Sequence, residues 1–169
     1  MNDNFSAFSK RINNRFFFTQ FLLAKLPAAY FAGLKIEAFD EGKAVVSVKQ
    51  KWFNKNPFRS IYFAVLTMAA EMSTGVLCMG NIYKRNPSVS LLVTEQRGIF
   101  HKKALGKILF TCADGNKIAE AVETAVTTTN PVTVICYSKG FNSNNEMVAE
   151  FWVSWSFKAR NSKTSPLTV

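Results

Sequence analysis

The sequence has few residues of the kinds that build metal sites and disulfide frameworks. It holds one histidine and three cysteines, Cys78, Cys112 and Cys136, which are widely spaced and odd in number. This argues against a disulfide framework, and no CxxC pair or histidine–cysteine cluster suggests a metal. Each cysteine lies in an apolar segment, so we expect buried free thiols in a reducing cytoplasm.

The single histidine, His101, also limits the catalytic classes. A Ser-His-Asp triad would have to use it, yet the sequence has no Gly-x-Ser-x-Gly elbow. It has no phosphate-cradling glycine loop either. We expect His101 to be a surface residue near Lys102 and Lys103.

Acidic residues are scarce, with eleven against twenty-one lysines and arginines, which gives a net charge of +10. Positive charge attracts nucleic acid, anionic lipid or a phosphate-bearing small molecule. The bases occur in small groups and are not interleaved with aromatic residues as in a single-strand binder. Solvated surface lysines explain most of them, so we do not expect a nucleic-acid partner.

Charge is almost absent from one long stretch, residues 61–82, in which Glu71 is the single charged residue. Ser60 can cap a helix here, and Gly75 or Gly80 can end it. Apolar residues fall on every face, which predicts a helix wrapped by other structure. The stretch is also long enough to cross a membrane. Polar residues in its middle and predicted strands on both sides favour a core helix without a membrane span.

The N-terminal segment predicts a helix over residues 5–26. Apolar residues follow a three-to-four spacing there, and Pro27 stops the pattern. A signal peptide is the alternative, because three bases precede the apolar run 16–24. Two polar residues interrupt that run and Lys25 closes it, which favours an amphipathic helix packed on the domain.

The remaining segments predict an antiparallel sheet. The last predicted strand alternates apolar and polar residues, which is typical of a sheet with one face on a core. A short helix is expected after Asp114. The predicted strands are 34–39, 43–53, 89–100, 106–113, 132–141 and 147–158. We therefore expect an α+β protein in which about six strands curve round one long helix, as a single domain over residues 1–169 with a frayed tail at 161–169.

This order resembles the hotdog fold, and a local motif narrows the resemblance. Small hotdog thioesterases of the PaaI-like type have an asparagine, five residues, His-Gly-Gly, and an acid seven residues after the second glycine. Here Asn56, Tyr62-Phe63-Ala64 and Glu71 have that spacing. The surrounding sequence is most similar to the DUF4442 branch of these proteins. Residues 100–107 are similar to the element that such families place beside the coenzyme A tail, and the resemblance covers residues 30–158.

The resemblance implies an acyl-CoA thioesterase that acts as a homodimer, or as a dimer of dimers, in the cytoplasm. It needs no cofactor, since coenzyme A is part of the substrate. The implied base or nucleophile is Glu71, and Asn56 would orient substrate or water. The other implied roles are carbonyl polarisation by the backbone N–H groups of Phe63 and Ala64, and ligand binding by Tyr62, Thr74, Lys102 and Lys103.

Each implied role has a structural alternative. Glu71 could be a buried carboxylate of the core, Asn56 could bond its own turn, and Thr74 could bond the preceding helical turn. Tyr62-Phe63-Ala64 stands where the family has His-Gly-Gly, and Phe63 is bulky. A non-catalytic hotdog protein that binds an acyl or aromatic ligand in the same groove is therefore the second hypothesis.

Overall fold

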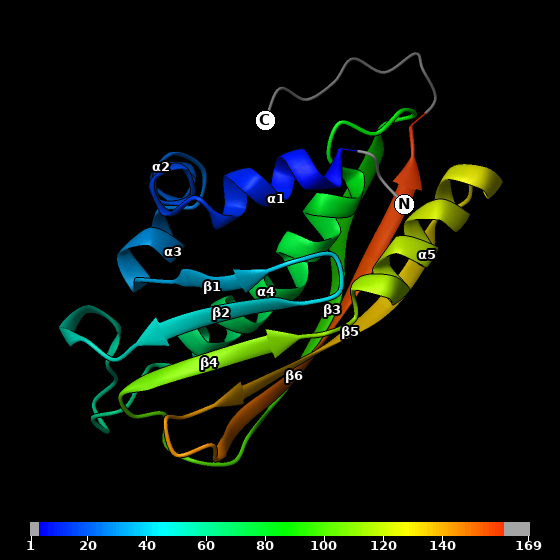
Figure 1. The fold of residues 1–169 in the computed structure, drawn as a ribbon. Coiled ribbons are helices and arrows are strands. Elements are labelled where there is room, and N and C mark those ends of the chain that lie inside the picture. The colour runs from blue at the N-terminus through cyan, green and yellow to red at the C-terminus, as the bar shows by residue number, and fades with distance from the viewer. Residues whose placement is uncertain (1–3, 161–169) are drawn as a thin grey trace.

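A curved antiparallel sheet wraps the long helix α4 (Phe63–Ile82) in the computed structural model, which describes residues 4–160 (Figure 1). This confirms the predicted α+β hotdog architecture. The strands are β1 (Lys35–Phe39), β2 (Ala44–Lys49), β3 (Val89–Phe100), β4 (Lys107–Cys112), β5 (Val132–Phe141) and β6 (Met147–Ala159). The other helices are α1 (Phe5–Asn13), α2 (Arg15–Lys25), α3 (Pro27–Ala32), α5 (Gly115–Thr128) and the short 3-10 helix η1 (Trp52–Asn54).

The sheet order is β1-β2-β4-β5-β6-β3, and each neighbouring pair is antiparallel. Strands β1 and β3 therefore form opposite edges. The α1 helix packs on β1, whereas most of β3 is exposed. The long edge left by β3 carries backbone groups that another strand could pair with.

Helix α4 is the core of the domain. By length and hydropathy it could cross a membrane, but 67% of that stretch is buried inside the fold. The helix begins at Phe63 rather than directly after Ser60, because the Ser60 hydroxyl is bonded to the Asn56 side chain. It also continues past Gly75, against which the Trp155 indole packs.

The predicted alternation of β6 is confirmed, with Phe151, Val153 and Phe157 buried against α4 and the facing strands. Glycines make room for the largest rings. A Cβ at Gly98 would lie 2.5 Å from the Phe151 ring, and one at Gly140 would lie 2.5 Å from the Phe110 ring. These approaches let neighbouring strands carry bulky aromatic residues at native packing density.

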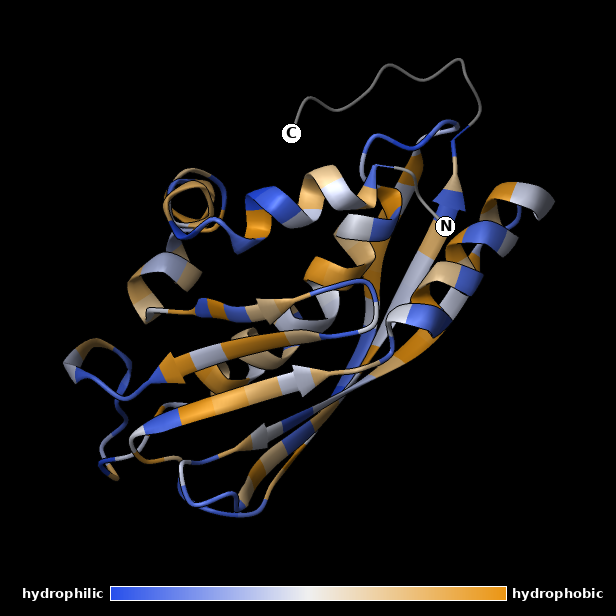
Figure 2. Cartoon of the chain, in the orientation of Figure 1, coloured by the Kyte–Doolittle hydropathy of each residue, from blue (hydrophilic) through white to orange (hydrophobic). Residues whose placement is uncertain are grey.

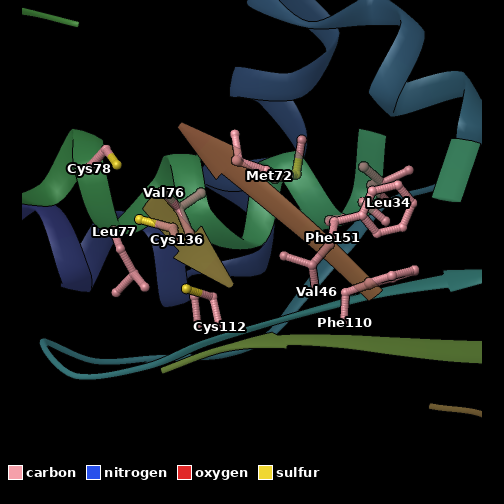
Figure 3. Close-up of a cluster of buried hydrophobic side chains, with 14 of the residues drawn as sticks. Leu34, Val46, Met72, Val76, Leu77, Cys78, Phe110, Cys112, Cys136 and Phe151 are labelled. Atoms are coloured by element: carbon pink, nitrogen blue, oxygen red, sulfur yellow. The ribbon is translucent and has the colours of Figure 1, made fainter. Parts of the chain in front are cut away.

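The three cysteines are buried and free, as predicted, and they lie together in one part of the core (Figure 3). Cys136 lies close to both Cys78 and Cys112. Burial raises the pKa of the Cys78 thiol, and the neighbouring Cys136 thiol, followed by burial, raises the pKa of Cys112. All three thiols therefore stay protonated at neutral pH. No group of metal-binding side chains occurs within residues 4–160.

The prediction of a single helix over residues 5–26 is wrong. The chain turns at Asn14, whose Oδ1 accepts hydrogen bonds from the backbone N–H groups of Phe16 (3.1 Å) and Phe17 (3.2 Å) and so caps α2. The two helices are packed into the domain, with Phe5, Ile12, Phe18 and Leu22 buried. Pro27 begins α3 at its first turn instead of ending the helical segment.

Asn14→Ala should lower the free energy of unfolding by about 1 kcal/mol, the usual cost of losing an N-cap side chain. Asn14→Ser is the matched control, since its hydroxyl can accept the same bonds and should leave stability near that of the wild type. Urea unfolding of the three proteins measures the difference. Equal stability of the alanine and serine variants would contradict the capping role.

The second predicted strand, 43–53, is too long. Strand β2 ends at Lys49 because the buried side chain of Asn54 draws the chain back. Its Nδ2 donates to the carbonyl oxygens of Ala32 and Lys49, both at 3.0 Å, and its Oδ1 accepts from Lys51 N–H at 2.9 Å. The predicted frayed tail, 161–169, lies outside the described residues.

Candidate functional site

Glu71 lies on the one stripe of α4 that the fold leaves partly open. Ala64, Thr67, Met68 and Glu71 are half-buried, whereas most of the residues between and beyond them are buried. Positions i, i+3, i+4 and i+7 share one face of a helix. The fold therefore gives solvent or ligand access to Glu71 from one side of its core helix.

The carboxylate of Glu71 has no ion pair and no hydrogen bond within residues 4–160. The carboxylate and the Trp155 indole both lie next to Gly75: a Cβ built on Gly75 would be 3.1 Å from Glu71 Oε1 and 3.2 Å from the indole ring. Burial raises the pKa of Glu71 above its ordinary value of 4.5. A carboxylate with a raised pKa is a better proton acceptor near neutral pH.

Trp155, which the sequence placed only in the core face of β6, forms the wall beside Glu71. Its Nε1–H donates to Thr74 Oγ1 at 2.8 Å, and the Thr74 hydroxyl donates to the backbone carbonyl of Glu71 at 2.8 Å. Thr74 is buried and its hydroxyl is used within the wall. Thr74 therefore positions the Trp155 ring. The sequence could not indicate this contact, because the two residues are 81 positions apart.

The N-terminus of α4 presents free backbone donors. Tyr62 is the N-cap residue and provides no side-chain cap, and within the described chain the N–H groups of Phe63 and Ala64 have no acceptor. Such amides, together with the helix dipole, favour an anion or a developing oxyanion. Half-exposed rings border the position: Phe63 contacts Tyr62 at 4.8 Å and Phe100 at 6.2 Å between ring centroids.

The two predicted halves of the catalytic site are not together in one chain. Glu71 follows Ala64 by seven residues, which is two helical turns or about 10 Å along the axis. The backbone positions of the predicted base and of the predicted amide donors are therefore well separated along α4.

Asn56 uses its side chain within its own loop. Its Oδ1 accepts from the backbone N–H groups of Phe58 (3.0 Å) and Ser60 (3.1 Å), and its Nδ2 donates to Ser60 Oγ (3.0 Å). These bonds fix the loop that leads into α4. In this structure Asn56 therefore has the loop-forming role that the sequence left as an alternative.

His101 lies at the surface near the lysine pair, as predicted. Its Nε2 is 2.9 Å from Glu150 Oε1, and Tyr137 donates its hydroxyl to the other oxygen of Glu150. Burial and this bond raise the pKa of Tyr137 to about 12. The His101 imidazole is thus held by Glu150 in the loop region after β3.

Lys102 and Lys103 are both exposed, but they differ in their partners. Lys102 Nζ forms an ion pair with Glu146, whereas Lys103 has no ion pair within residues 4–160. A phosphate that approached Lys102 would have to compete with Glu146. Of the two predicted phosphate contacts, Lys103 is the more available.

A cavity of about 540 Å³ lies away from Glu71, between the N-terminal helices and β1. Phe18, Leu22 and Leu34 provide apolar lining, and Arg15 and Lys51 provide positive charge. None of the predicted site residues lines this cavity. It is therefore separate from the candidate catalytic stripe.

Comparison with known proteins identifies relatives of the chain. The family described as a domain of unknown function, DUF4442, matches residues 15–153. No curated protein matches the chain.

Solved structures share the fold. A Pseudomonas aeruginosa protein of unknown function, described as a probable thioesterase, has a TM-score of 0.72 at 19% identity over 85% of this chain and 95% of its own. A protein of unknown function from Chlorobaculum tepidum has a TM-score of 0.74 at 18% identity over 90% and 94%. A thioesterase from Haemophilus influenzae has a TM-score of 0.61 at 11% identity over 84% and 90%.

Proposed function

The chain belongs to the DUF4442 family, and we propose that it hydrolyses a thioester of the acyl-coenzyme A type. The observation that carries the proposal is Glu71: a carboxylate with a raised pKa and no partner within residues 4–160, on the partly open stripe of a core helix. A buried charge without a partner is costly, so its presence calls for a use. Similar folds named thioesterases provide independent support.

In the proposed reaction the Glu71 carboxylate takes a proton from water, and the water oxygen attacks the thioester carbonyl carbon. The alternative first step is direct attack by Glu71, which forms an anhydride that water then cleaves. The Phe63 and Ala64 N–H groups of a second chain stabilise the oxyanion. The carbon–sulfur bond breaks and the proton goes to the leaving thiolate. No cofactor is required, since coenzyme A leaves as the thiol product.

The active unit in this proposal is a homodimer. Strand β3 spans twelve residues, most of them exposed, and Leu92 on it is 65% exposed. Pairing two β3 strands would join two sheets and remove both free edges. Lys103, with Lys102, would then contact coenzyme A phosphates from the loop after β3. The outer sheet faces could join two such dimers into a dimer of dimers.

We also propose that the protein is cytoplasmic, and its free buried thiols support this location.

Leu92→Glu should convert the dimer to a folded monomer at micromolar concentration, because pairing would bury an unpartnered charge. Light scattering after gel filtration measures the mass. Ile135→Glu is the matched control: Ile135 is similarly exposed but lies on the central strand β5, so dimers should persist. A monomeric wild-type protein would refute the dimer, as would a Leu92→Glu protein that remains dimeric.

A non-catalytic binding protein is the second candidate, and the half-exposed Phe63 ring beside the free amides favours it. A panel of acyl-coenzyme A substrates tests both functions. Hydrolysis that depends on Glu71 supports the enzyme. Thermal stabilisation by acyl-coenzyme A without any hydrolysis supports the binding protein.

A further inference from the structure

An exposed apolar surface lies on α2, α3 and η1. We define the α2–α3–η1 face by its seven exposed large apolar residues: Phe16, Phe17, Leu23, Leu26, Phe31, Trp52 and Phe53. Trp52 is 81% exposed and Phe16 is 68% exposed. The Phe31 and Phe53 rings lie 6.0 Å apart between centroids, which joins α3 to η1. Water contact with so many grouped apolar side chains is unfavourable and marks an interaction surface.

Helix α2 is apolar on both sides. Phe18 and Leu22 are buried in the domain, whereas the outward side carries residues at positions i, i+1, i+4, i+7 and i+8. These outward residues are Phe16, Phe17, Gln20, Leu23 and Ala24. Figure 2 shows the apolar character of α2 at the edge of the molecule. The outward side is therefore a second apolar stripe that the fold itself does not cover.

The positive charge of the chain is concentrated on the same part of the sequence. Residues 4–36 and 43–70 each contain five lysines or arginines and no acid. Glu37, Asp40 and Glu41 lie between these two segments, so residues 4–70 together hold ten bases and three acids. The two segments include α1, α2, α3 and η1. Arg15 and Lys25 belong to α2, and Lys51 and Lys55 flank η1, so lysine and arginine residues accompany the apolar face.

We propose that the α2–α3–η1 face docks on an anionic lipid bilayer, with its aromatic and leucine side chains in the headgroup region and its bases on lipid phosphates. Exposed aromatic and aliphatic residues flanked by lysine and arginine are the features of helices that lie in a membrane interface. A second copy of the chain fits less well, because a symmetric pair would bring two positive surfaces together. A nucleic acid would match the charge but would leave Leu23 and Leu26 without apolar contacts.

The face lies at the β1 side of the sheet, and β3 forms the opposite edge. Docking on lipid therefore leaves the free β3 edge available. The α4 helix stays inside the domain, so the association is peripheral and does not use it as a membrane span. The inference is independent of whether the chain hydrolyses a thioester.

Sedimentation with vesicles tests the proposal. Wild-type protein should sediment with vesicles of phosphatidylglycerol and phosphatidylcholine, bind phosphatidylcholine vesicles weakly, and dissociate as salt is raised. Phe16→Ser/Phe17→Ser removes two exposed rings and should weaken binding about tenfold or more. Lys25→Gln/Lys55→Gln should weaken vesicle binding about 25-fold, because each base near an anionic membrane surface contributes about fivefold to the affinity.

Lys117→Gln/Lys158→Gln is the matched control, because it removes the same charge from α5 and β6 and should leave binding within about twofold of the wild type. Circular dichroism checks that every variant is folded. Equal losses in both lysine pairs would overturn the proposal in favour of bulk charge. Absence of vesicle binding would also overturn the proposal. Self-association, or binding of a single-stranded oligonucleotide, that depends on the Phe16 and Phe17 rings would then identify a different occupant of the face.

Discussion

Glu71→Gln should lower kcat for acyl-coenzyme A hydrolysis by about 10²–10⁴-fold while the protein remains folded. Glutamine keeps the shape of the side chain beside Gly75 and Trp155 but cannot take a proton from water or attack a carbonyl. Single-turnover kinetics with a substrate identified in the panel gives the size of the loss. Glu120→Gln, the same change at an exposed position of α5, is the matched control and should keep the wild-type rate.

The pH dependence gives an independent measure of the same residue. Burial raises the pKa of Glu71 in the folded state, so the rate should fall on the acid side at a pH above the ordinary glutamate value of 4.5. The ionised form also destabilises the folded state, because unfolding returns the charge to water. Stability attributable to Glu71 is therefore highest below pH 4.5 and falls as pH rises through the folded pKa.

Replacement of Glu71 by glutamine should for this reason raise the melting temperature at neutral pH, and the gain should shrink as the pH is lowered. Calorimetry of both proteins across the acid range measures this. A Glu71→Gln protein that melts at a lower temperature and hydrolyses substrate at the wild-type rate would show that the carboxylate is structural and does no chemistry.

Phe151→Ala should lower the free energy of unfolding by about 3–5 kcal/mol, the largest stability loss that we expect from a single truncation in this chain. Phe151 is 1% exposed, and its ring contacts those of Phe100 (5.4 Å) and Phe110 (5.8 Å) between centroids. Gly98, directly opposite on β3, has no side chain to fill the space. The loss is a large share of the roughly 5–15 kcal/mol that stabilises a domain.

Phe100→Ala is the matched control for this truncation. It removes the same atoms from a half-exposed ring, so less apolar surface is returned to water and no closed cavity forms. Guanidinium unfolding at one protein concentration compares the variants. If both truncations cost the same, the Gly98–Phe151 packing does not have the importance assigned to it.

The long helix and the strands could be predicted from the sequence because their signals are local. An apolar run with one charge indicated α4, and period-two alternation indicated β6. The errors arose where a polar side chain redirects the backbone. Asn14 caps α2 and splits one predicted helix in two, and Asn54 ends β2 by binding the carbonyl groups of Lys49 and Ala32.

The site was predictable in part for the same reason. Spacing within a single helix indicated Glu71, and the structure leaves its carboxylate unpaired within residues 4–160. Trp155 beside it could not be found, since its bond to Thr74 depends on how β6 packs across α4. The role of Asn56 could not be decided either, because a loop asparagine and a substrate-orienting one look alike in sequence.

Thiol burial makes the chain directly suitable for fluorescent labelling. All three native thiols lie in the core, and burial contributes to the raised pKa of Cys78 and Cys112, so a maleimide reagent finds no native thiolate within reach. A cysteine introduced on the surface would be the sole reactive thiol without removal of any native one. Placed by Gln20→Cys, at the centre of the outward side of α2, an environment-sensitive dye would record by its emission colour whether that helix meets water or lipid.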